Sequence, residues 1–456
     1  MTAVQELEAK PTTRRTIYDR VFWLCYLANF SLVTANTLTF RFAEFVRFLG
    51  GTERVTGTIV GVGLAATLLV RVRLGSDIDR FGTRRLWLAS GVLFISGSLL
   101  FALARSLSWQ LYLARMLFSV GVAGMFTCVM VFIQDHVPPE RRTEAIGNLG
   151  SSGFLGMIAG SLLSDWILTG LPGGRLPFEV LFGVTAVLGL ICSAIVVVVT
   201  RHDGRPPAPV APPFHQLIVR YWPGSVVLAA AMIGVGVTVT SVFLTRFCTE
   251  RHLGGIGLFF TGYSLSAFTF RILTRRWSHT VGRHKMILFG LAGHTTGHLM
   301  LIFAEAPWQL IAPSIACGFG HALLFPAVVS LGAGKFPRQY RGTGTNVMIG
   351  FSEVGLAVAS PALGWIIDRF GFEAMLGTTA ATAILIGILY GLTGARSCDR
   401  EGAHEDRGSP RPSQRPFWLG EPSEEPVVAA SAESRSVVSD EDDDLPAPFP
   451  HTGRMA

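Results

Sequence analysis

The densest cluster of charged side chains in this chain lies at residues 75–85, with the sequence GSDIDRFGTRR, between two long apolar stretches. Carboxylates and guanidinium groups form strong charge-assisted hydrogen bonds, and glycines allow helices joined by such a turn to approach closely. A second version, RWSHTVGRHK, lies at residues 276–285 and keeps basic side chains without an acid. We interpret the first cluster as an ionic latch between helices and the second as a copy that has lost its acid. The alternative is that these charges only set the orientation of the chain in a membrane.

Two ionisable side chains lie well inside apolar stretches, where a charge is costly unless it is paired or faces a cavity. Arg115 lies about two helical turns from the end of its stretch, and Glu353 almost three turns into another. A lone carboxyl such as Glu353 can carry a proton, and a hydrogen bond to the preceding helix is the alternative. For Arg115, a functional role and an ion pair with Asp165 both stay open.

Amide and hydroxyl side chains share single helix faces in two of the apolar stretches. Asn29 and Asn36 are seven residues apart, and Thr238, Ser241 and Thr245 are three or four apart. Such faces either line a polar cavity or form hydrogen bonds between helices, and the sequence leaves both interpretations open.

Further polar residues lie near the ends of the apolar stretches or on adjacent ones. Arg41 and Glu44 either face a substrate or form a gate, and a solvated helix end is the alternative. His294 and His298 are one helical turn apart, and His321 lies on the following stretch. Imidazoles bind zinc, but no acid or cysteine is seen to complete the set, so no metal site is predicted. His321 is kept as a candidate for the path of a substrate or proton.

The composition places these side chains in a membrane protein. Of the 456 residues, 50% are hydrophobic and only 15% are charged, and the mean hydropathy is +0.45. A soluble domain carries about 25% charged residues. Charge-poor runs of roughly 19 to 26 residues recur, and each is long enough to cross ~30 Å of hydrocarbon as a helix. These runs predict twelve spans, at residues 21–43, 54–74, 86–104, 109–134, 145–169, 178–199, 222–245, 254–274, 286–304, 308–333, 344–367 and 373–394.

Basic residues are concentrated in alternate connections between these spans, which the positive-inside rule places in the cytoplasm. Both termini are then cytoplasmic, including the segment 1–16. The tail at residues 396–456 is acidic and rich in Pro and Ser, a composition that predicts disorder. The six cysteines are scattered without a CxxC pair, so neither a disulfide framework nor a zinc site is predicted.

The chain contains an internal repeat. The segment that starts at Trp109, WQLYLARMLFSVG, is similar to the segment that starts 199 residues later at Trp308, WQLIAPSIACGFG. At the same offset Gly156 matches Gly355. With an offset larger by one residue, Arg71 matches Arg271 and Gly82 matches Gly282. Six predicted spans lie on either side of the hydrophilic stretch 201–220. The repeat therefore predicts two parallel six-helix bundles, residues 17–200 and 221–395, with a site at the bilayer midplane between them.

Over residues 17–395 the chain resembles transporters of the major facilitator superfamily. The pattern that follows the second span of that family is matched here by Gly75, Asp79, Arg80, Gly82 and Arg84, with Thr83 in place of a usual arginine. RMLFSVGVAG after Ala114, DHVPPERRTEAIGN and GFGHALLFPAVV are also similar to family patterns. The resemblance implies that Arg115 takes part in coupling or substrate binding. It also implies a latch that holds the outward-facing state, formed by Asp79 with Arg80, Arg84, Asp135 and Arg142.

The sequence thus predicts an all-helical, twelve-span secondary transporter that moves a small organic solute by alternating access. Coupling to protons and export rather than uptake are expected, with facilitative uptake or a solute sensor of the same fold as alternatives. The motifs GxxxxGK[ST], HExxH and GxSxG do not occur, so neither ATP hydrolysis nor an enzyme is predicted. The expected partners are the solute, the proton and the lipid bilayer of the cell membrane, with no cofactor, no metal and no nucleic acid. A monomer is expected, and the identity of the solute is not encoded in any motif.

Overall fold

The structure, a computed structural model, describes residues 18–137, 141–201, 214–274, 277–337 and 340–408. Every regular element among these residues is a helix. The chain divides into a compact unit, residues 1–402, and a second unit, residues 403–456. Most of the predicted tail lies outside the described residues, so its disorder stays a prediction.

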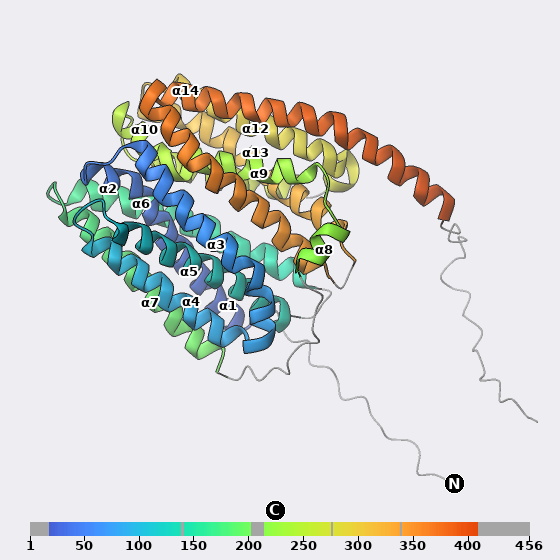
Figure 1. The fold of residues 1–456 in the computed structure, drawn as a ribbon, viewed down its shortest axis with the longest axis horizontal. Helices are drawn as coiled ribbons and strands as arrows, with labels where there is room; N and C mark the ends of the chain where they lie inside the picture. Colours follow the sequence, from blue (N-terminus) through green and yellow to red (C-terminus); the bar gives the residue numbers. More distant parts are fainter. Residues whose placement is uncertain (1–17, 138–140, 202–213, 275–276, 338–339, 409–456) are drawn as a thin grey trace, which may run out of the picture. The chain divides into compact units, whose positions relative to one another are not determined.

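The first half of the compact unit is a bundle of helices that pack on one another, drawn in blue to green in Figure 1. Its elements are α1 Arg20–Leu38, η1 Thr39–Arg41, α2 Phe42–Phe48, α3 Glu53–Phe81, α4 Thr83–Leu103, α5 Trp109–His136, α6 Arg142–Gly170 and α7 Leu176–Val199. The second half forms another bundle, in yellow-green to orange. Its elements are α8 Phe214–Arg220, α9 Val226–Thr238, η3 Val239–Phe243, α10 Leu244–Glu250, α11 Gly257–Leu273, η4 Ser278–Gly282, α12 Arg283–Ile302, η5 Pro307–Leu310, α13 Ile311–Gly334 and α14 Arg341–Gly408. Contacts between the bundles include those of α6 with α11.

Nine helical stretches in the described part of the chain are long and apolar enough to cross a membrane. One of them, Gly342–Thr393, passes Gly371, where φ is 85° and the helical backbone is interrupted. This break falls between the predicted spans 344–367 and 373–394. Helix α11, with 17 residues, and helix α12 are not among the nine. A helical membrane protein is therefore confirmed, while the count of twelve spans stays a prediction.

Glycine ends the helical turn at both copies of the charged cluster. Gly82, between α3 and α4, has a φ of 83°, and Gly282, directly before α12, has a φ of 88°. A side chain with a Cβ is strained in this region of backbone space, whereas glycine is not. The two glycines occupy matching positions of the repeat, so the repeat holds at the level of the backbone as well as in sequence.

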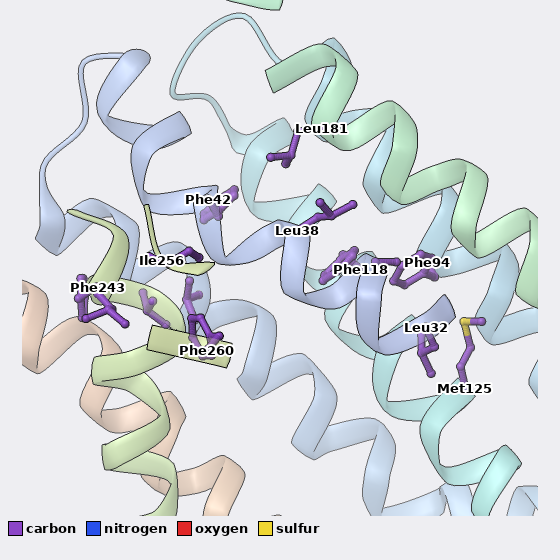
Figure 2. Packing of buried hydrophobic residues seen from close by; sticks show 14 of the residues in the cluster. Leu32, Leu38, Phe42, Phe94, Phe118, Met125, Leu181, Phe243, Ile256 and Phe260 are labelled. Atoms are coloured by element: carbon purple, nitrogen blue, oxygen red, sulfur yellow. The ribbon is translucent and has the colours of Figure 1, made fainter. Parts of the chain in front are cut away.

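Aromatic rings fill much of the core of the first bundle (Figure 2). The rings of Phe94 in α4 and Phe118 in α5 lie 4.8 Å apart between centroids. Helix α5 approaches α4 closely at Gly121, where a Cβ would lie 2.5 Å from the backbone nitrogen of Phe94. Offset or tilted ring pairs at this distance stabilise a core beyond the apolar area that they bury. The α4–α5 pair is thus a rigid support for the helices that face the other bundle.

Candidate functional site

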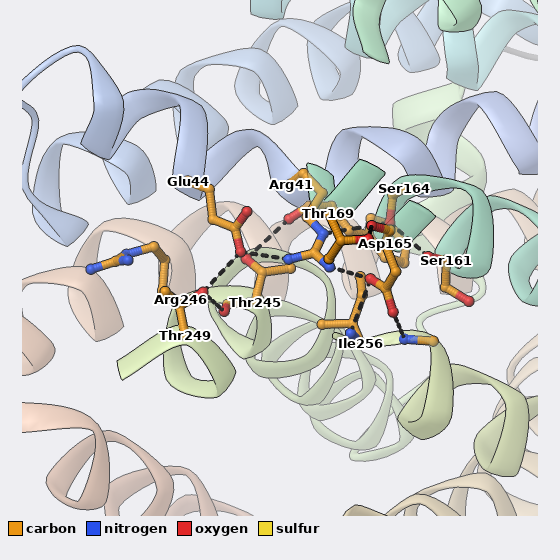
Figure 3. Close-up of polar contacts among 12 residues, drawn as sticks. Arg41, Glu44, Ser161, Ser164, Asp165, Thr169, Thr245, Arg246, Thr249 and Ile256 are labelled. Carbon is orange, nitrogen blue, oxygen red and sulfur yellow. Dashed lines mark hydrogen bonds and ion pairs between the residues drawn. The ribbon is translucent and has the colours of Figure 1, made fainter. Parts of the chain in front are cut away.

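Asp165 of α6 forms a contact between the two bundles at one end of the molecule (Figure 3). Its carboxylate accepts hydrogen bonds from the backbone N–H groups of Ile256, at 3.1 Å, and Gly257, at 2.7 Å. These two groups lie at the start of α11, where free N–H groups and the helix dipole favour a negative charge. Arg41, only 5% exposed, donates to the same carboxylate. An acid of the first bundle therefore caps a helix of the second.

Two more contacts between the bundles surround Arg41. Arg41 donates to Glu44 over 2.6 Å, and the Thr249 hydroxyl of α10 donates to the same carboxylate oxygen of Glu44 over 3.0 Å (Figure 3). The Thr245 hydroxyl donates to the backbone carbonyl of Phe40 over 3.3 Å. The polar face of the seventh predicted span thus contacts the end of the first span.

A second acid caps a helix of the opposite bundle, and here the acid belongs to the second bundle. Asp368 of α14 accepts hydrogen bonds from the backbone N–H groups of Glu53, at 2.9 Å, and Arg54, at 3.0 Å, at the start of α3. The Glu53 carboxylate in turn accepts a 2.8 Å hydrogen bond from Arg246 of α10. An acid of the second bundle thus caps a helix of the first, which makes the contact reciprocal.

Eight side chains take part in these contacts, and we call them the interbundle clamp: Arg41, Glu44, Glu53, Asp165, Thr245, Arg246, Thr249 and Asp368. Sequence reasoning selected Arg41 and Glu44 as candidates but missed Glu53 and Asp368. A signal for both existed, because Glu53 directly precedes a predicted span and Asp368 directly follows one. An acid in such a place can cap a neighbouring helix, but the sequence does not say which helix is its neighbour.

Glu353 is not a lone carboxyl, and that expectation is corrected. It lies on α14 and forms a two-pronged ion pair with Arg71 of α3, in which Arg71 Nε donates to Glu353 Oε2 over 2.7 Å and Nη2 donates to Oε1. The side chains of Arg71 and Glu353 are 9% and 18% exposed. A cavity of about 190 Å³ lies beside the pair, lined in part by Leu68, Asn346 and Phe351. The pair joins the two bundles, and its planar geometry suits an arginine.

Arg271, the repeat counterpart of Arg71, has a different partner. It lies on α11 with its guanidinium carbon 5.1 Å from the ring centroid of Phe154 on α6. Phe154 is the repeat counterpart of Glu353, at the same offset that relates Gly156 to Gly355. A carboxylate therefore faces one arginine, and the π-face of a ring faces the other. The Nε of Arg271 is buried without a hydrogen-bond partner.

Arg115 does not pair with Asp165, since Asp165 bonds to Arg41 and to the start of α11. The guanidinium carbon of Arg115 lies 5.1 Å from the ring centroid of Phe42 and 5.7 Å from that of Phe118. Its Nε and Nη1 are buried without a hydrogen-bond partner. Arg115 is thus a cation held between aromatic rings, with donors that a ligand could use.

The predicted polar faces of the first and seventh spans make mainly local or interhelical hydrogen bonds. Asn29 donates over 2.8 Å to the Ser152 hydroxyl of α6, and Asn36 is half-buried. Thr238 donates to its own helix and, at 3.5 Å, to the Leu356 carbonyl of α14. Ser241 donates over 2.7 Å to a carbonyl of its own helix. The interhelical interpretation describes Asn29 and Thr238, which both tie neighbouring helices together.

The expectation that no cysteine completes the histidine set is wrong. Cys317 of α13 lies with His294 and His298, and the three possible ligand atoms are within 4.8 Å of one another. His321 does not belong to this group. Its ring stacks on Phe325 with centroids 5.6 Å apart.

The predicted latch at residues 75–85 stays a prediction. The side chains of Asp79 and Arg142 and the surroundings of Gly75 lie outside what the structure describes. Arg84 donates to the Thr200 carbonyl over 3.4 Å, and the guanidinium of Arg80 lies over the ring of Phe81. Asp135 is exposed at the end of α5.

Comparison with known proteins gives the same architecture. A sequence profile described as Major Facilitator Superfamily matches residues 22–255 and 226–430. An uncharacterized MFS-type transporter of Burkholderia pseudomallei (strain 1106a) is 25% identical over 388 residues, which cover 82% of this chain and 92% of the relative. One of Pseudomonas aeruginosa (strain UCBPP-PA14) is 27% identical over 190 residues, which cover 42% of this chain and 46% of the relative.

Two solved structures show the same fold at low identity. A peptide transporter in complex with sulfate superposes with a TM-score of 0.69 at 14% identity, covering 82% of this chain and 94% of that one. A variant of a nucleoside transporter superposes with a TM-score of 0.68 at 9% identity, covering 81% of this chain and 98% of that one. The profile matches span most of the chain, and the relatives are named as transporters. The chain therefore belongs to the Major Facilitator Superfamily, a family of membrane transporters rather than enzymes.

Proposed function

We propose that this protein is a secondary transporter that moves a small organic solute by alternating access, driven by protons and favouring export over uptake. The moving bodies are the bundles at residues 17–200 and 221–395, joined by the linker 201–220. The protein acts as a monomer in the cell membrane with both termini in the cytoplasm. Family membership and two bundles that contact each other through polar groups support this proposal.

In this proposal the interbundle clamp closes the outer side of the protein. The positive-inside rule assigns the basic connections to the cytoplasm, so the interbundle clamp lies at the opposite, outer end. There, reciprocal capping by Asp165 and Asp368 holds the bundles together. Export requires the clamp to open after the solute has entered from the cytoplasmic side. The polar clamp contacts lie beside apolar ones, such as the rings of Phe40 and Phe260 with centroids 5.1 Å apart, and together they must be weak enough for the equilibrium to reverse.

The ion pair between Arg71 and Glu353 is the observation that carries the proposal of proton coupling. It is a bidentate charged contact between α3 and α14, so it belongs to both moving bodies. Protonation of Glu353 removes the negative charge and weakens the pair, which favours separation of the two helices. Loss of the proton restores the pair. One carboxyl group thereby links proton binding to the position of the bundles, which is what coupled transport requires.

The charge inside the bundles favours an anionic solute. Away from the clamp, Arg71, Arg115 and Arg271 all lie within spans predicted from the sequence, and among these three only Arg71 is paired with a carboxylate in the described part of the chain. A cation that has only aromatic rings as neighbours gains when a carboxylate or phosphate binds to it. We therefore include an acidic group, with an organic body, in the proposed solute.

The proposal is tested with purified protein in liposomes under an imposed pH gradient. A panel of radiolabelled organic acids is first screened by exchange across the membrane at equal pH, and the best solute is then used for gradient-driven transport. Glu353→Gln keeps the size of the side chain but cannot titrate. We expect it to abolish accumulation against a gradient while exchange of the solute persists.

Glu305→Gln is the matched control, because Glu305 is an exposed acid outside the spans. It should leave both activities unchanged. Full gradient-driven accumulation by Glu353→Gln would refute proton coupling through this residue. Binding of an acid without exchange by the wild-type protein would refute transport itself and favour a solute sensor.

A further inference from the structure

Three potential metal ligands meet inside the second bundle, and none of them belongs to the clamp. His294 and His298 lie one turn apart on α12, and Cys317 lies on the adjacent helix α13. Their possible ligand atoms are all within 4.8 Å of one another. His294 is 4% exposed, and His298 and Cys317 are fully buried. Two imidazoles and a thiol at this separation need only small side-chain movements to reach one ion.

The repeat shows that the fold does not require metal-binding side chains at these positions. The counterparts of His294, His298 and Cys317 in the first bundle are Phe94, Ser98 and Phe118. Phe94 and Phe118 form the aromatic pair in the core between α4 and α5. An apolar core thus occupies this place in one bundle, and a set of metal-binding side chains occupies it in the other. Packing alone does not explain the substitution.

The histidines lack the hydrogen bonds that buried imidazoles normally make. Neither ring nitrogen of His294 or of His298 has a partner, although all four atoms are buried. A buried polar group without a partner costs free energy, so nearly all such groups in proteins are satisfied. A neutral imidazole also has only one lone-pair nitrogen, which a metal ion would use. One ion would therefore engage one nitrogen of each ring, and these unsatisfied nitrogens are a second, independent sign of a ligand.

We propose that His294, His298 and Cys317 form a binding site for a monovalent copper ion, Cu(I). Thiolate and imidazole ligands suit copper and zinc rather than magnesium or calcium. The described residues place no carboxylate in the cluster. With one thiolate and two neutral imidazoles, Cu(I) gives a site with no net charge, whereas Zn²⁺ leaves one positive charge in the membrane interior. A net charge buried there is costly, so the charge balance favours copper.

The surroundings indicate a resident ion rather than a transported one. Glycine makes room for the ligands: a Cβ at Gly297 would lie 2.3 Å from the sulfur of Cys317. A Cβ at Gly236 of α9 would lie 3.3 Å from Nδ1 of His294, so α9 closes the site on that side. All the ligands come from two adjacent helices of one bundle. The ion therefore stabilises that bundle and does not depend on the transport cycle.

The test uses the full chain, purified with a tag that contains no histidine, in anaerobic buffer with ascorbate. Titration with Cu(I) against a chromophoric copper chelator should give about one tightly bound ion per chain. X-ray absorption at the copper edge should show both sulfur and imidazole nitrogen ligands, a result that needs no variant. Bound copper should also raise the melting temperature of the protein. No bound copper, or copper without a sulfur ligand, would overturn the proposal.

Variants then assign the ligands. Cys317→Ser and His298→Phe should each weaken copper binding by more than about 100-fold and abolish the shift in melting temperature. Cys128→Ser is the control, because Cys128 is an equally buried free cysteine in the first bundle. It should bind copper like the wild type. Copper binding that survives Cys317→Ser, or a site that takes zinc in preference to Cu(I), would contradict the assignment. Transport failure of the wild type would leave these measurements unaffected.

Discussion

Removing the charge of Asp165 should open the outer end of the protein. Asp165→Asn takes the negative charge from the start of α11 and leaves buried Arg41 with Glu44 as its remaining acidic partner. Removing one member of a largely buried pair costs about 3 to 5 kcal/mol. About a fifth of the Asp165 side chain is exposed, and Asn retains a hydrogen-bond acceptor. We therefore expect Asp165→Asn to destabilise the closed state by about 2 to 4 kcal/mol. The ratio of the closed to the open population should then fall by a factor of about 30 to 700.

A native cysteine reports this opening. Cys248 lies on α10, the helix that supplies Arg246 and Thr249 to the clamp, and it is fully buried in the closed state. A membrane-impermeant maleimide added to intact cells should label it in proportion to the open population. The labelling rate should rise by about the same factor of 30 to 700 in Asp165→Asn. Mass spectrometry of individual peptides measures each cysteine separately, so buried Cys192 of the first bundle serves as an internal control.

Glu179→Gln is the matched variant for this experiment. Glu179 of α7 pairs with Arg175, the residue directly before that helix, and its side chain is 43% exposed. A surface pair contributes about 0 to 1 kcal/mol, so labelling of Cys248 should change by no more than about fivefold. Unchanged labelling in Asp165→Asn would refute the role of the clamp. An equal rise at Cys192 would show unfolding instead, and labelling only from the cytoplasmic side would refute the orientation.

Three further predictions concern the solute, the predicted latch and the topology. Arg271→Gln should weaken binding of the anionic solute by about tenfold or more in exchange assays, because hydrogen bonds to charged groups are worth about 1.5 to 3 kcal/mol; equal affinity would exclude contact with the solute. Asp79→Asn should reduce transport strongly with binding within a few fold, whereas His279→Asn should have little effect; equal losses in both would contradict the asymmetry of the repeat. Gly173→Cys should be labelled only from outside and Arg205→Cys only from the cytoplasm, and the reverse pattern would refute the orientation.

Sequence reasoning predicted what depends on local composition and on the repeat. The helical membrane fold follows from apolar runs, and the turns at Gly82 and Gly282 follow from glycine spacing. The pairing of Arg71 with Glu353 did not follow, because it joins residues 282 positions apart whose contact depends on how two bundles dock. The sequence had identified both residues, Arg71 as a match in the repeat and Glu353 as an acid within a span. It did not indicate that the helices carrying them lie side by side.

The cluster around Cys317 was missed for a different reason. His294 and His298 were identified from their spacing on one helix, while the third ligand came from the neighbouring helix. The repeat contained the missing information, because the contact of Phe94 with Phe118 in the first bundle predicts the contact of His294 with Cys317 in the second. That inference needs the side-chain contacts of one bundle, which only a structure provides.

Reciprocal capping at the clamp has a consequence for how the two halves tolerate sequence change. Asp165 and Asp368 each bind backbone N–H groups rather than side chains of the opposite bundle. Any amino acid except proline at exposed Arg54 preserves such a donor, whereas Ile256 is fully buried in the core and must also stay apolar. The acceptor side, in contrast, requires an acid. A saturation-mutagenesis survey should therefore find that Asp165 and Asp368 must stay acidic, that position 54 rejects only proline, and that position 256 accepts apolar residues other than proline. The contact between the halves then constrains the two acids more than the side chains that they face.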